Sequence, residues 1–482
     1  MNSYPDWLTE QMINGVNGFN IDSFLLALEG WRRGLNLKFY QNPEEHSDLG
    51  IIGYDPAGKF FSLSDQNNTH YFYRSRGDKV KNETVDIGTN KGETKKRMQS
   101  AGLPVPQGFE FTSGSSTDEV LEEASALGFP LVLKPTFGSL GKGVITNIQS
   151  TEELQESIAD VKKAFPYYRD FIVEEHAEGV DVRVYVIEDE IAGATKRVRP
   201  NVTGDGKSTI EALIHLKNET RKANPHTATR LIKLDEHLQN YLARQNKGLQ
   251  TIPDEGELIY VKGNSNISSG GDSVDITEDL PAHVKKIAVD AVKAVDGLVH
   301  AGVDLLMKED EATTIEINPT AGIALHTFPL YGEKQNIAEK IIDYYFPSTK
   351  AGSGSVSKLI YFDYKNVLRM IRSNFFKMVE IPDAPRGPIC AKRYVVSGKV
   401  QKVGYRNWIR KHAIENGLHG YTRNLNNGNV VVVVAGDDED KVEGFKDFCW
   451  QGPSGAKVEK ILEYEWNTQV KVGFEIRNTK KK

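Results

Sequence analysis

The sequence predicts a multidomain protein that combines α/β and α+β folds. Its 482 residues correspond to about three domains at about 150 residues each, and each of these is long enough to bury a core. Helical and strand-like patterns alternate as far as about residue 346, where the Gly- and Ser-rich stretch PSTKAGSGSVS follows. The remaining segment has its own order of strands and helices.

The composition excludes several classes of protein. The 60 Lys and Arg residues and the 66 Asp and Glu residues leave a net charge of −6, which predicts no binding to a nucleic-acid backbone. The first residues lack a basic stretch followed by an apolar one, and no run approaches the ~20 apolar residues of a membrane span. Only Cys390 and Cys449 are present, too few for a disulfide framework or a thiolate zinc site. We therefore expect a cytoplasmic protein without a membrane span, and leave open whether it is a homo-oligomer.

Residues 1–88 are expected to form an N-terminal α/β domain. In DSFLLALEGWRRGL the apolar residues recur at helical spacing, and the strand-like stretches NLKFY and LGIIGY follow. Arg74 and Arg76, in FFSLSDQNNTHYFYRSRGDKV, are candidates for binding a substrate carboxylate. A solvated basic turn explains these two arginines equally well.

Residues 89–347 are expected to form a second α/β domain. A helix begins near Lys91 and stops at Gly102 and the prolines that follow it. The next helical pattern, TDEVLEEASALG, leads through Pro130 into the short apolar strand LVLK. Strands and helices alternate from there to the end of the domain.

The C-terminal third of the chain is expected to contain a linker and a smaller domain. Residues 348–388 form a linker with a basic amphipathic helix in FDYKNVLRMIRSNFFKMVEI. Such a helix can lie on a membrane or bind a partner, and a connector packed on its own domain is the simpler interpretation. Residues 389–482 have strand patterns at AKRYVVSGKV, GNVVVVVAG and VKVGFEIR and two helical patterns, an order that predicts a ferredoxin-like α+β sandwich.

The first group of candidate functional residues lies in LVLKPTFGSLGKGV. Lys134 interrupts an apolar strand, where an unpaired ammonium is costly, so we expect it to meet an anion. The glycine-rich loop that follows offers backbone N–H groups and a further positive charge, which suit the phosphates of a nucleotide. Taken alone, such a loop is also a common turn.

Two further groups of polar residues lie on predicted strands. In VDVRVYV, Asp181 and Arg183 alternate with valines and so share one face. Asp304 interrupts the apolar strand AGVDLLM, and Glu316 and Asn318 are two residues apart in TTIEINPTAG. Oxygen atoms of Asp, Glu and Asn are the hard ligands that Mg²⁺ uses when it also bridges nucleotide phosphates.

The order of these features resembles that of the ATP-grasp ligases, from Lys91 to about Phe346. Within that family, RVRPNVTGDGKSTIEALI and YVKGNSNISSGGDSVDITEDL are most similar to the ATP-grasp domains of cyanophycin synthetase and of the bifunctional glutathione synthetase. The chain lacks the Mur-ligase-like portion of the first and the γ-glutamylcysteine ligase portion of the second, so their products are not carried over. The resemblance implies an ATP-grasp fold preceded by a pre-ATP-grasp domain at residues 1–88, with ATP and two Mg²⁺ ions as cofactors and Mn²⁺ as an alternative metal.

The resemblance also implies a role for each matching residue. Glu174 and the backbone near Ala177 would meet the adenine, and Asp181 would take the ribose. The residues expected to hold ATP are Lys91, Lys134, Gly138, Ser139, Gly141, Lys142, Gly143, Glu174, Glu175, Ala177, Asp181 and Arg183. The residues expected to bind magnesium are Asp304, Glu316 and Asn318.

One cation is expected to neutralise the transferring phosphoryl group. Lys196 and Arg197 both follow a predicted strand and are the candidates for this catalytic role. Related D-alanyl-D-alanine ligases have an arginine two residues before the metal aspartate, where this chain has Gly302. We therefore prefer Arg197.

The resemblance implies that ATP phosphorylates a carboxylate and that an amine then displaces phosphate from the acyl phosphate to leave an amide. Positioning and charge cancellation would supply most of the catalysis of the first step. The expected substrates are small carboxylates and amines, amino acids or short peptides. A second loop, GNSNISSGGDS at residues 263–273, either binds an amino-acid substrate or is a surface turn.

The second constellation lies in SGKVQKVGYRNW. Residues 401–405 can curl so that successive N–H groups point inward, which makes an anion nest next to Arg406. Asn424 follows at the start of a turn. Together with GPSGAKVEKI and the terminal GFEIR, these residues resemble acylphosphatase over its whole length. The resemblance implies that Arg406 and the loop bind phosphate and that Asn424 orients the attacking water.

The two resemblances imply that both constellations recognise an acyl phosphate. The leading interpretation is a carboxylate-amine ligase whose C-terminal domain hydrolyses intermediate that escapes or forms on a wrong carboxylate, in the manner of an editing site. The alternative is an acyl phosphate hydrolase whose ATP-grasp part acts as a nucleotide-dependent sensor. The fused domain acting on unrelated acyl phosphates also stays open.

Overall fold

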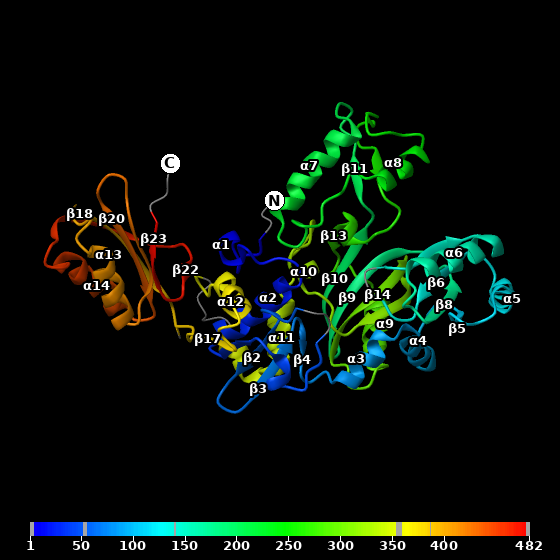
Figure 1. Cartoon of the computed structure of the whole chain (residues 1–482), viewed down its shortest axis with the longest axis horizontal. Coiled ribbons are helices and arrows are strands. Elements are labelled where there is room, and N and C mark those ends of the chain that lie inside the picture. The colour runs from blue at the N-terminus through cyan, green and yellow to red at the C-terminus, as the bar shows by residue number, and fades with distance from the viewer. Residues whose placement is uncertain (1–3, 52–54, 139–140, 353–358, 386, 479–482) are drawn as a thin grey trace. The chain divides into compact units, whose positions relative to one another are not determined.

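The computed structural model describes residues 4–51, 55–138, 141–352, 359–385 and 387–478, the side chains of residues 351 and 352 excepted. Contacts divide the chain into two compact units, and Figure 1 shows their elements. Unit 1 comprises Met1–Pro5, Asn17–Asp22 and Arg74–Ile341, and unit 2 comprises Asp6–Val16, Ser23–Tyr73 and Ile342–Lys482. The predicted fold class, a mixture of α/β and α+β parts, is confirmed.

The larger sheet of unit 1 has the strand order β13-β10-β9-β14-β15, with antiparallel pairing throughout. Its strands are β9 (Val180–Ile187), β10 (Glu190–Val198), β13 (Asp272–Asp275), β14 (His300–Lys308) and β15 (Glu311–Asn318). The alternating valines of β9 are buried in a core that includes the apolar face of α9 (Ala282–Lys293). Arg183 of β9 pairs with Asp304 of β14, so the polar residues between the valines gather on the opposite face.

A second sheet of unit 1 has the order β5-β8-β6-β7. Its elements are β5 (Gly108–Thr112), α5 (Thr117–Leu127), β6 (Leu131–Pro135), β7 (Ile145–Ile148), α6 (Thr151–Ala164) and β8 (Asp170–Glu175). The two helices bury apolar residues such as Val120 and Leu154 in one core with the sheet. Every residue of β6 is buried, Lys134 included, so the ammonium of this lysine requires a partner.

Unit 1 contains further helices and short strands. They are β4 (Arg76–Gly77), α3 (Asn82–Thr89), α4 (Lys91–Ser100), β11 (Asn201–Thr203), α7 (Ile210–Ala223), α8 (Glu236–Ala243), β12 (Leu258–Tyr260), the 3-10 turn η2 (Ile267–Ser269), α10 (Ala324–Thr327) and α11 (Ile337–Tyr345). Helix α4 begins at Lys91, as predicted, because the side chain of Asn90 accepts a hydrogen bond from the Glu93 N–H at 3.0 Å.

The N-terminal part of unit 2 is a sheet covered by helices. Its elements are α1 (Glu10–Ile13), α2 (Asn20–Arg32), β1 (Asn36–Tyr40), the 3-10 turns η1 (Pro43–Glu45) and η3 (Pro347–Gly352), β2 (Phe60–Ser64), β3 (Thr69–Tyr73), β16 (Ile360–Tyr361), α12 (Tyr364–Arg372) and β17 (Met378–Ile381). Strand β17 pairs with β1, although some 340 residues of chain separate them (Leu37 with Ile381). The ring of Tyr364 packs at 5.5 Å from Phe24, and Val367 and Ile371 are buried. The apolar face of the amphipathic helix is therefore occupied.

That helix is shorter than the sequence pattern suggests. It ends at Arg372, whose neighbour Ser373 takes the C-cap position. Phe375, which continues the apolar spacing, lies beyond the helix end and is 89% exposed. The pattern alone could not locate this end because no glycine or proline interrupts it.

The C-terminal part of unit 2 is a five-stranded sheet in the order β21-β18-β20-β19-β23. Its elements are β18 (Cys390–Lys399), α13 (Tyr405–Glu415), β19 (His419–Asn424), β20 (Val430–Gly436), α14 (Glu439–Gln451), β21 (Lys457–Glu465), β22 (Val470–Lys471) and β23 (Phe474–Arg477). Both helices share one core with alternate residues of β18 and β20, and Figure 1 shows them on one side of the sheet. The predicted ferredoxin-like sandwich is confirmed.

None of the helices within the described ranges combines the length and the apolar character needed to cross a membrane.

Candidate functional site

The centre of the candidate site is the carboxylate of Asp304. Arg183 donates to it from Nε to Oδ1 and from Nη2 to Oδ2, both at 2.6 Å, and the Nη2 of Arg197 lies 3.1 Å from Oδ2. The three residues come from the adjacent strands β14, β9 and β10, which the pairing of Asp304 with Arg183 aligns. The carboxylate is thus held by a bidentate, charge-assisted pair of the strongest type and by a second guanidinium.

These charges determine the protonation state of the cluster. Burial acts to raise the pKa of Asp304, but the charges of Arg183 and Arg197 outweigh it and lower this pKa to about 2. Burial acts to lower the pKa of Arg197, and the nearby Asp304 and Asp181 outweigh that, so its pKa is raised. Asp304 and Arg197 therefore carry their full charge at neutral pH.

Asp181, the residue expected to bind ribose, is engaged by the same cluster. Its Oδ1 accepts from Arg197 Nε at 2.8 Å, and its Oδ2 accepts from the hydroxyl of Ser265. Burial and the charge of Asp304 raise the pKa of Asp181, although Arg197 opposes this. Ser265 belongs to the second loop, residues 263–273, which the fold therefore brings to the polar face of β9.

The other two expected metal ligands lie on the neighbouring strand. Glu316 pairs directly with Asp304 across β14 and β15. Asn318 donates from Nδ2 to Glu316 Oε1 at 2.9 Å, which leaves its own amide oxygen available, and Glu316 Oε2 lies 3.6 Å from Lys91 Nζ. Within the described ranges, no three His, Cys, Asp or Glu side chains form a group that could hold a metal ion.

Two carboxylates and one amide oxygen nevertheless fit Mg²⁺. This ion keeps several waters and is commonly bound by one or two carboxylates together with substrate phosphates. The Oδ1 of Asp304 accepts one hydrogen bond from Arg183, and a carboxylate oxygen has a second lone pair. A Mg²⁺ ion at this position would therefore not need to break the Arg183 pair.

The expected phosphate lysines meet anions or carbonyls in the structure. Lys134 Nζ donates to Glu174 Oε1 at 2.5 Å, and Lys95 Nζ donates to Glu174 Oε2 at 2.8 Å. Lys91 Nζ donates to the carbonyl of Gly138 at 2.9 Å. Glu174 is buried (3% exposed) between two ammonium groups, so its carboxylate neutralises lysines here.

Lys95 is a candidate site residue that the sequence analysis missed. Burial lowers the pKa of this lysine, against the charge of Glu174, as for a cation in a poorly hydrated site. It lies four residues after Lys91 in α4, so both side chains project from one face of the helix. The four-residue spacing of Lys91 and Lys95 in KGETKKR could have indicated that Lys95 belongs to the site.

The glycine-rich loop begins beside these lysines. Gly141 and Gly143 have φ of +71° and +72°, which favour glycine. A Cβ at Gly138 would lie 3.2 Å from the hydroxyl of Tyr168, so this ring packs on the loop. Lys142 is exposed, and Ser139 lies outside the described residues.

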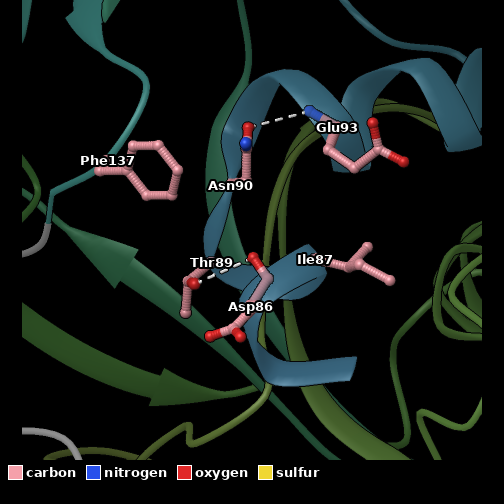
Figure 2. A pocket seen from close by; sticks show the side chains of 6 residues that line it. All are labelled: Asp86, Ile87, Thr89, Asn90, Glu93 and Phe137. Atoms are coloured by element: carbon pink, nitrogen blue, oxygen red, sulfur yellow. Dashed lines mark hydrogen bonds between the residues drawn. The ribbon is translucent and has the colours of Figure 1, made fainter. Parts of the chain in front are cut away.

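A pocket of about 400 Å³ connects the loop with the start of α4. Figure 2 shows Phe137, just before the loop, across from Thr89 and Asn90 at the start of the helix. Its lining residues are Asp86, Ile87, Thr89, Asn90, Glu93 and Phe137. The segments that carry Lys91 and Gly138 thus border one space.

The expected adenine segment lies at the end of β8. Glu175 is exposed, and its Oε2 accepts from the Gln107 N–H at 3.0 Å. Ala177 lies in the connection between β8 and β9, just after His176, whose N–H donates to the Pro130 carbonyl at 3.0 Å. Hydrogen bonds from the backbone N–H groups of Glu175 and His176, to the carbonyls of Gln107 and Pro130, therefore fix the start of this connection.

Lys196 and Arg197 lie on opposite faces of the large sheet. Lys196 pairs with Val182 of β9 and Val274 of β13, on the face of the valine core. Arg197, one residue later, reaches Asp181 and Asp304 on the other face. Of these two residues, Arg197 is therefore the one that lies close to the candidate metal ligands.

Gly302 lies two residues before Asp304 in β14. A Cβ at Gly302 would lie 2.6 Å from the Cβ of Ala321 and 3.5 Å from the Cδ of Arg183. Carbon atoms do not approach as closely as the first of these distances, so no side chain fits at this position unless the backbone moves. Arg183 lies next to the position that a side chain at Gly302 would occupy.

Replacing Gly302 by alanine should therefore destabilise the protein. Overpacking of this kind costs about 1–3 kcal/mol, and the midpoint of thermal unfolding, Tm, should fall accordingly. Gly248→Ala is the matched control, because a Cβ there meets nothing within 4 Å. An unchanged Tm for Gly302→Ala would mean that the Ala321 turn moves away without cost.

The second constellation lies in the C-terminal sheet. Arg406 is the second residue of α13 and follows a loop in which Lys402 and Gly404 have φ of +61° and +79°. No ion pair or hydrogen bond engages Arg406 among the described residues. The side chain of Gln401 donates to the carbonyls of Leu425 at 2.9 Å and Asn429 at 2.8 Å, which ties the loop to the turn after β19.

Asn424 is the last residue of β19, directly before that turn. Its Oδ1 is buried and has no hydrogen-bond partner within the described chain. A buried acceptor without a donor is costly, and a water O–H would satisfy it. Gln401 thus links the loop before Arg406 to the turn that follows Asn424.

Three family models match the chain. They are the RimK-like ATP-grasp domain at residues 89–235, the ATP-grasp domain at residues 239–322 and acylphosphatase at residues 392–476.

The chain is also similar to curated proteins and solved structures. It is 31% identical over 274 residues to cyanophycin synthetase of Crocosphaera subtropica, which covers 55% of this chain and 31% of that protein. It is 32% identical over 263 residues to the glutathione biosynthesis bifunctional protein GshAB of Desulfotalea psychrophila, which covers 53% of this chain and 33% of that protein. The structure of an acylphosphatase from Coxiella burnetii is 32% identical, covers 18% of this chain and 93% of that chain, and has a TM-score of 0.18. The chain spans about a third of the length of these curated relatives.

Proposed function

Since the chain belongs to the ATP-grasp ligases and joins their domain to an acylphosphatase domain, we propose that it is an ATP-dependent carboxylate-amine ligase. It forms an amide through an acyl phosphate, with an amino acid or a short peptide as substrate, and its C-terminal domain hydrolyses acyl phosphates. The observation that carries the ligase proposal is the Asp304 cluster, in which two guanidiniums and a carboxylate face Glu316 and Asn318. These groups can hold a triphosphate and balance its charge.

Different residues have different roles in the phosphorylation of the carboxylate. Lys91 and Lys134 bind phosphate oxygens, and Lys134 has two further N–H donors beside the one given to Glu174. Arg197 cancels the charge that develops on the transferring phosphoryl group. Asp304, Glu316 and Asn318 would hold Mg²⁺, which supplies further charge compensation on the phosphates.

The amine then attacks the acyl carbon, and phosphate leaves. We infer that the polar face of β9 and the loop with Ser265 surround the substrates at this step, because Ser265 already contacts Asp181. The cytoplasm is the expected location. The domain limits 1–88, 89–347, 348–388 and 389–482 are likewise proposals, since they follow sequence patterns.

In the C-terminal domain, Arg406 and the N–H groups of residues 401–405 bind the phosphate of an acyl phosphate, and Asn424 orients a water for attack. The guanidinium of Arg406, which pairs with no described residue, and the orphaned Oδ1 of Asn424 support these roles. We propose that the substrate includes the ligase's own intermediate when no amine captures it. Such hydrolysis would consume ATP without forming product.

The ligase proposal is tested with the Arg406→Ala protein, in which the second domain cannot remove the intermediate. ATP, Mg²⁺, hydroxylamine and a panel of amino acids are supplied, and ADP and hydroxamate are measured. We expect a hydroxamate that depends on one carboxylate, in amounts equal to the ADP released. Glu316→Gln in the same background should abolish both products.

The alternative, a hydrolase with an ATP-grasp nucleotide sensor, gives a different result. Neither ADP nor hydroxamate would form with any carboxylate, while the wild type would still cleave acetyl phosphate. Hydroxamate formation that survives Glu316→Gln would contradict the metal assignment.

A further inference from the structure

Lys95 of α4 supplies one of the two ammonium groups that contact Glu174. Its Nζ donates to Glu174 Oε2 at 2.8 Å, while Lys134 Nζ donates to Oε1 at 2.5 Å. All three residues are buried, with exposed fractions of 9% for Lys95, 5% for Lys134 and 3% for Glu174. Each oxygen of the carboxylate is therefore bound by a different lysine.

The three groups together leave one positive charge in a buried place. Two ammonium groups face one carboxylate, and within the described chain neither lysine forms an ion pair with another acidic residue. Buried charges are screened only weakly by water and salt. Without Lys95, the charges of Glu174 and Lys134 would cancel, and Oε2 of the carboxylate would lose its donor. The positive charge that Lys134 offers to an anion therefore depends on Lys95.

The helix that carries Lys95 is also fixed to the glycine-rich segment. The Lys91 N–H donates to the carbonyl of Thr136, just after β6, at 3.2 Å, and Lys91 Nζ donates to the Gly138 carbonyl at 2.9 Å. Lys95 lies about one turn further along α4 and so projects from the same side. One helix thus holds Lys91 beside the loop and brings Lys95 to Glu174.

Lys96, the next residue of α4, contacts the same sheet in a different environment. Its Nζ lies 2.7 Å from Glu110 Oε1 on β5, and the two side chains are 67% and 36% exposed. An exposed ion pair of this kind contributes little, because water screens it. Lys96 therefore links α4 to the sheet as Lys95 does, but it adds no charge to the buried group.

We infer that Lys95 is a positioning residue for nucleotide binding, which holds the carboxylate of Glu174 so that the ammonium group of Lys134 stays available to the phosphates. This inference rests on the proposed function, in which Lys134 binds phosphate oxygens, and it adds a residue to that site. Lys95 acts through Glu174 and does not have to touch ATP. Lys134 retains two N–H donors for the phosphates beside the one given to Glu174.

The test is calorimetric titration of the full chain with a non-hydrolysable imido analogue of ATP in the presence of Mg²⁺. Lys95→Met should weaken binding about tenfold or more, since hydrogen bonds to charged groups contribute this much. Combining Lys95→Met with Glu174→Gln should recover most of the lost affinity, because Lys134 then keeps its charge with no bare carboxylate beside it. Lys96→Met is the matched control and should bind as the wild type does.

The double variant separates the charge of Lys95 from a merely structural role. If Lys95 only supported the fold, a second substitution in the same buried group would not restore binding. Thermal unfolding of each variant is measured in parallel, and where Lys95→Met lowers Tm the affinity of the double variant decides.

Wild-type affinity in Lys95→Met would overturn the inference, as would a double variant that binds no more tightly than Lys95→Met. A loss in Lys96→Met as large as that in Lys95→Met would also overturn it, because the contact between α4 and the sheet would then be the cause. Binding requires no turnover. A wild type that binds the analogue but forms neither ADP nor hydroxamate from ATP would therefore count against the ligase function and not against the role of Lys95.

Discussion

Replacing Arg197 by methionine should lower the rate of ADP formation about 10³-fold or more, since an arginine that stabilises a transferring phosphoryl group contributes about 10³–10⁵ to kcat. Arg197 is the cation best placed for this role, with its Nη2 at 3.1 Å from Asp304 and 2.5 Å from Asp181. Its charge is secured because the neighbouring carboxylates raise its pKa. Affinity for ATP should change little, because Lys91 and Lys134 bind the ground state. The measurement is steady-state kinetics of ADP release in the Arg406→Ala background.

The chain offers a matched control for this experiment in Lys196→Met. Lys196 is adjacent in sequence and carries the same charge, but it lies on the valine side of the sheet. Its replacement should leave kcat nearly unchanged, because its side chain lies on the face of the sheet away from Asp304. If Lys196→Met caused the large loss and Arg197→Met did not, the assignment of the two faces to their functions would be wrong.

Much of the polar face was predictable from the sequence because strands have a period of two. In VDVRVYV the valines from Val182 onward fill a core, and Arg183 between them reaches Asp304 on the other face, as the alternation requires. The same reasoning placed Glu316 and Asn318 on one face of β15, where their side chains are hydrogen-bonded. Local periodicity was sufficient here because each residue's face depends on its own strand alone.

The partners of these residues were not predictable, because they depend on contacts between distant segments. Glu174 was expected to bind adenine, yet its carboxylate lies between Lys134 and Lys95, 40 and 79 residues away in the chain. Ser265 lies in a loop without a regular pattern, and only the fold brings its hydroxyl to Asp181, 84 residues away in the chain.

Contacts between distant segments also limited the prediction for residues 348–388, the linker with the amphipathic helix. Its helical pattern was clear, but the pairing of β17 with β1 joins residues far apart in the chain, such as Ile381 and Leu37. Strand pairing over such a separation leaves no signal in a single sequence beyond short apolar runs.

The second large effect is expected for Arg406→Ala, which should lower the hydrolysis of benzoyl phosphate about 10²–10³-fold. A preorganised donor in such a site contributes this much to transition-state stabilisation. Arg406 is available because no residue of the described chain pairs with it, and α13 is fixed by the hydroxyl of Tyr405, which donates to the Cys449 carbonyl at 2.5 Å. Arg410→Ala, one turn further along α13 and exposed, is the matched control and should retain activity.

The division of roles between Arg406 and Asn424 predicts different kinetic signatures. Arg406 binds the phosphate before and during reaction, so its loss should raise KM and lower kcat. Asn424 contacts the attacking water, which matters only in the transition state, so Asn424→Ala should lower kcat and leave KM near that of the wild type. Equal effects of both variants on KM would mean that Asn424 also binds phosphate. Near wild-type hydrolysis by Arg406→Ala would mean that the loop at residues 401–405 is not the phosphate site. The orphaned Oδ1 of Asn424 favours the first pattern, because an acceptor can hold a water O–H but repels a phosphate oxygen.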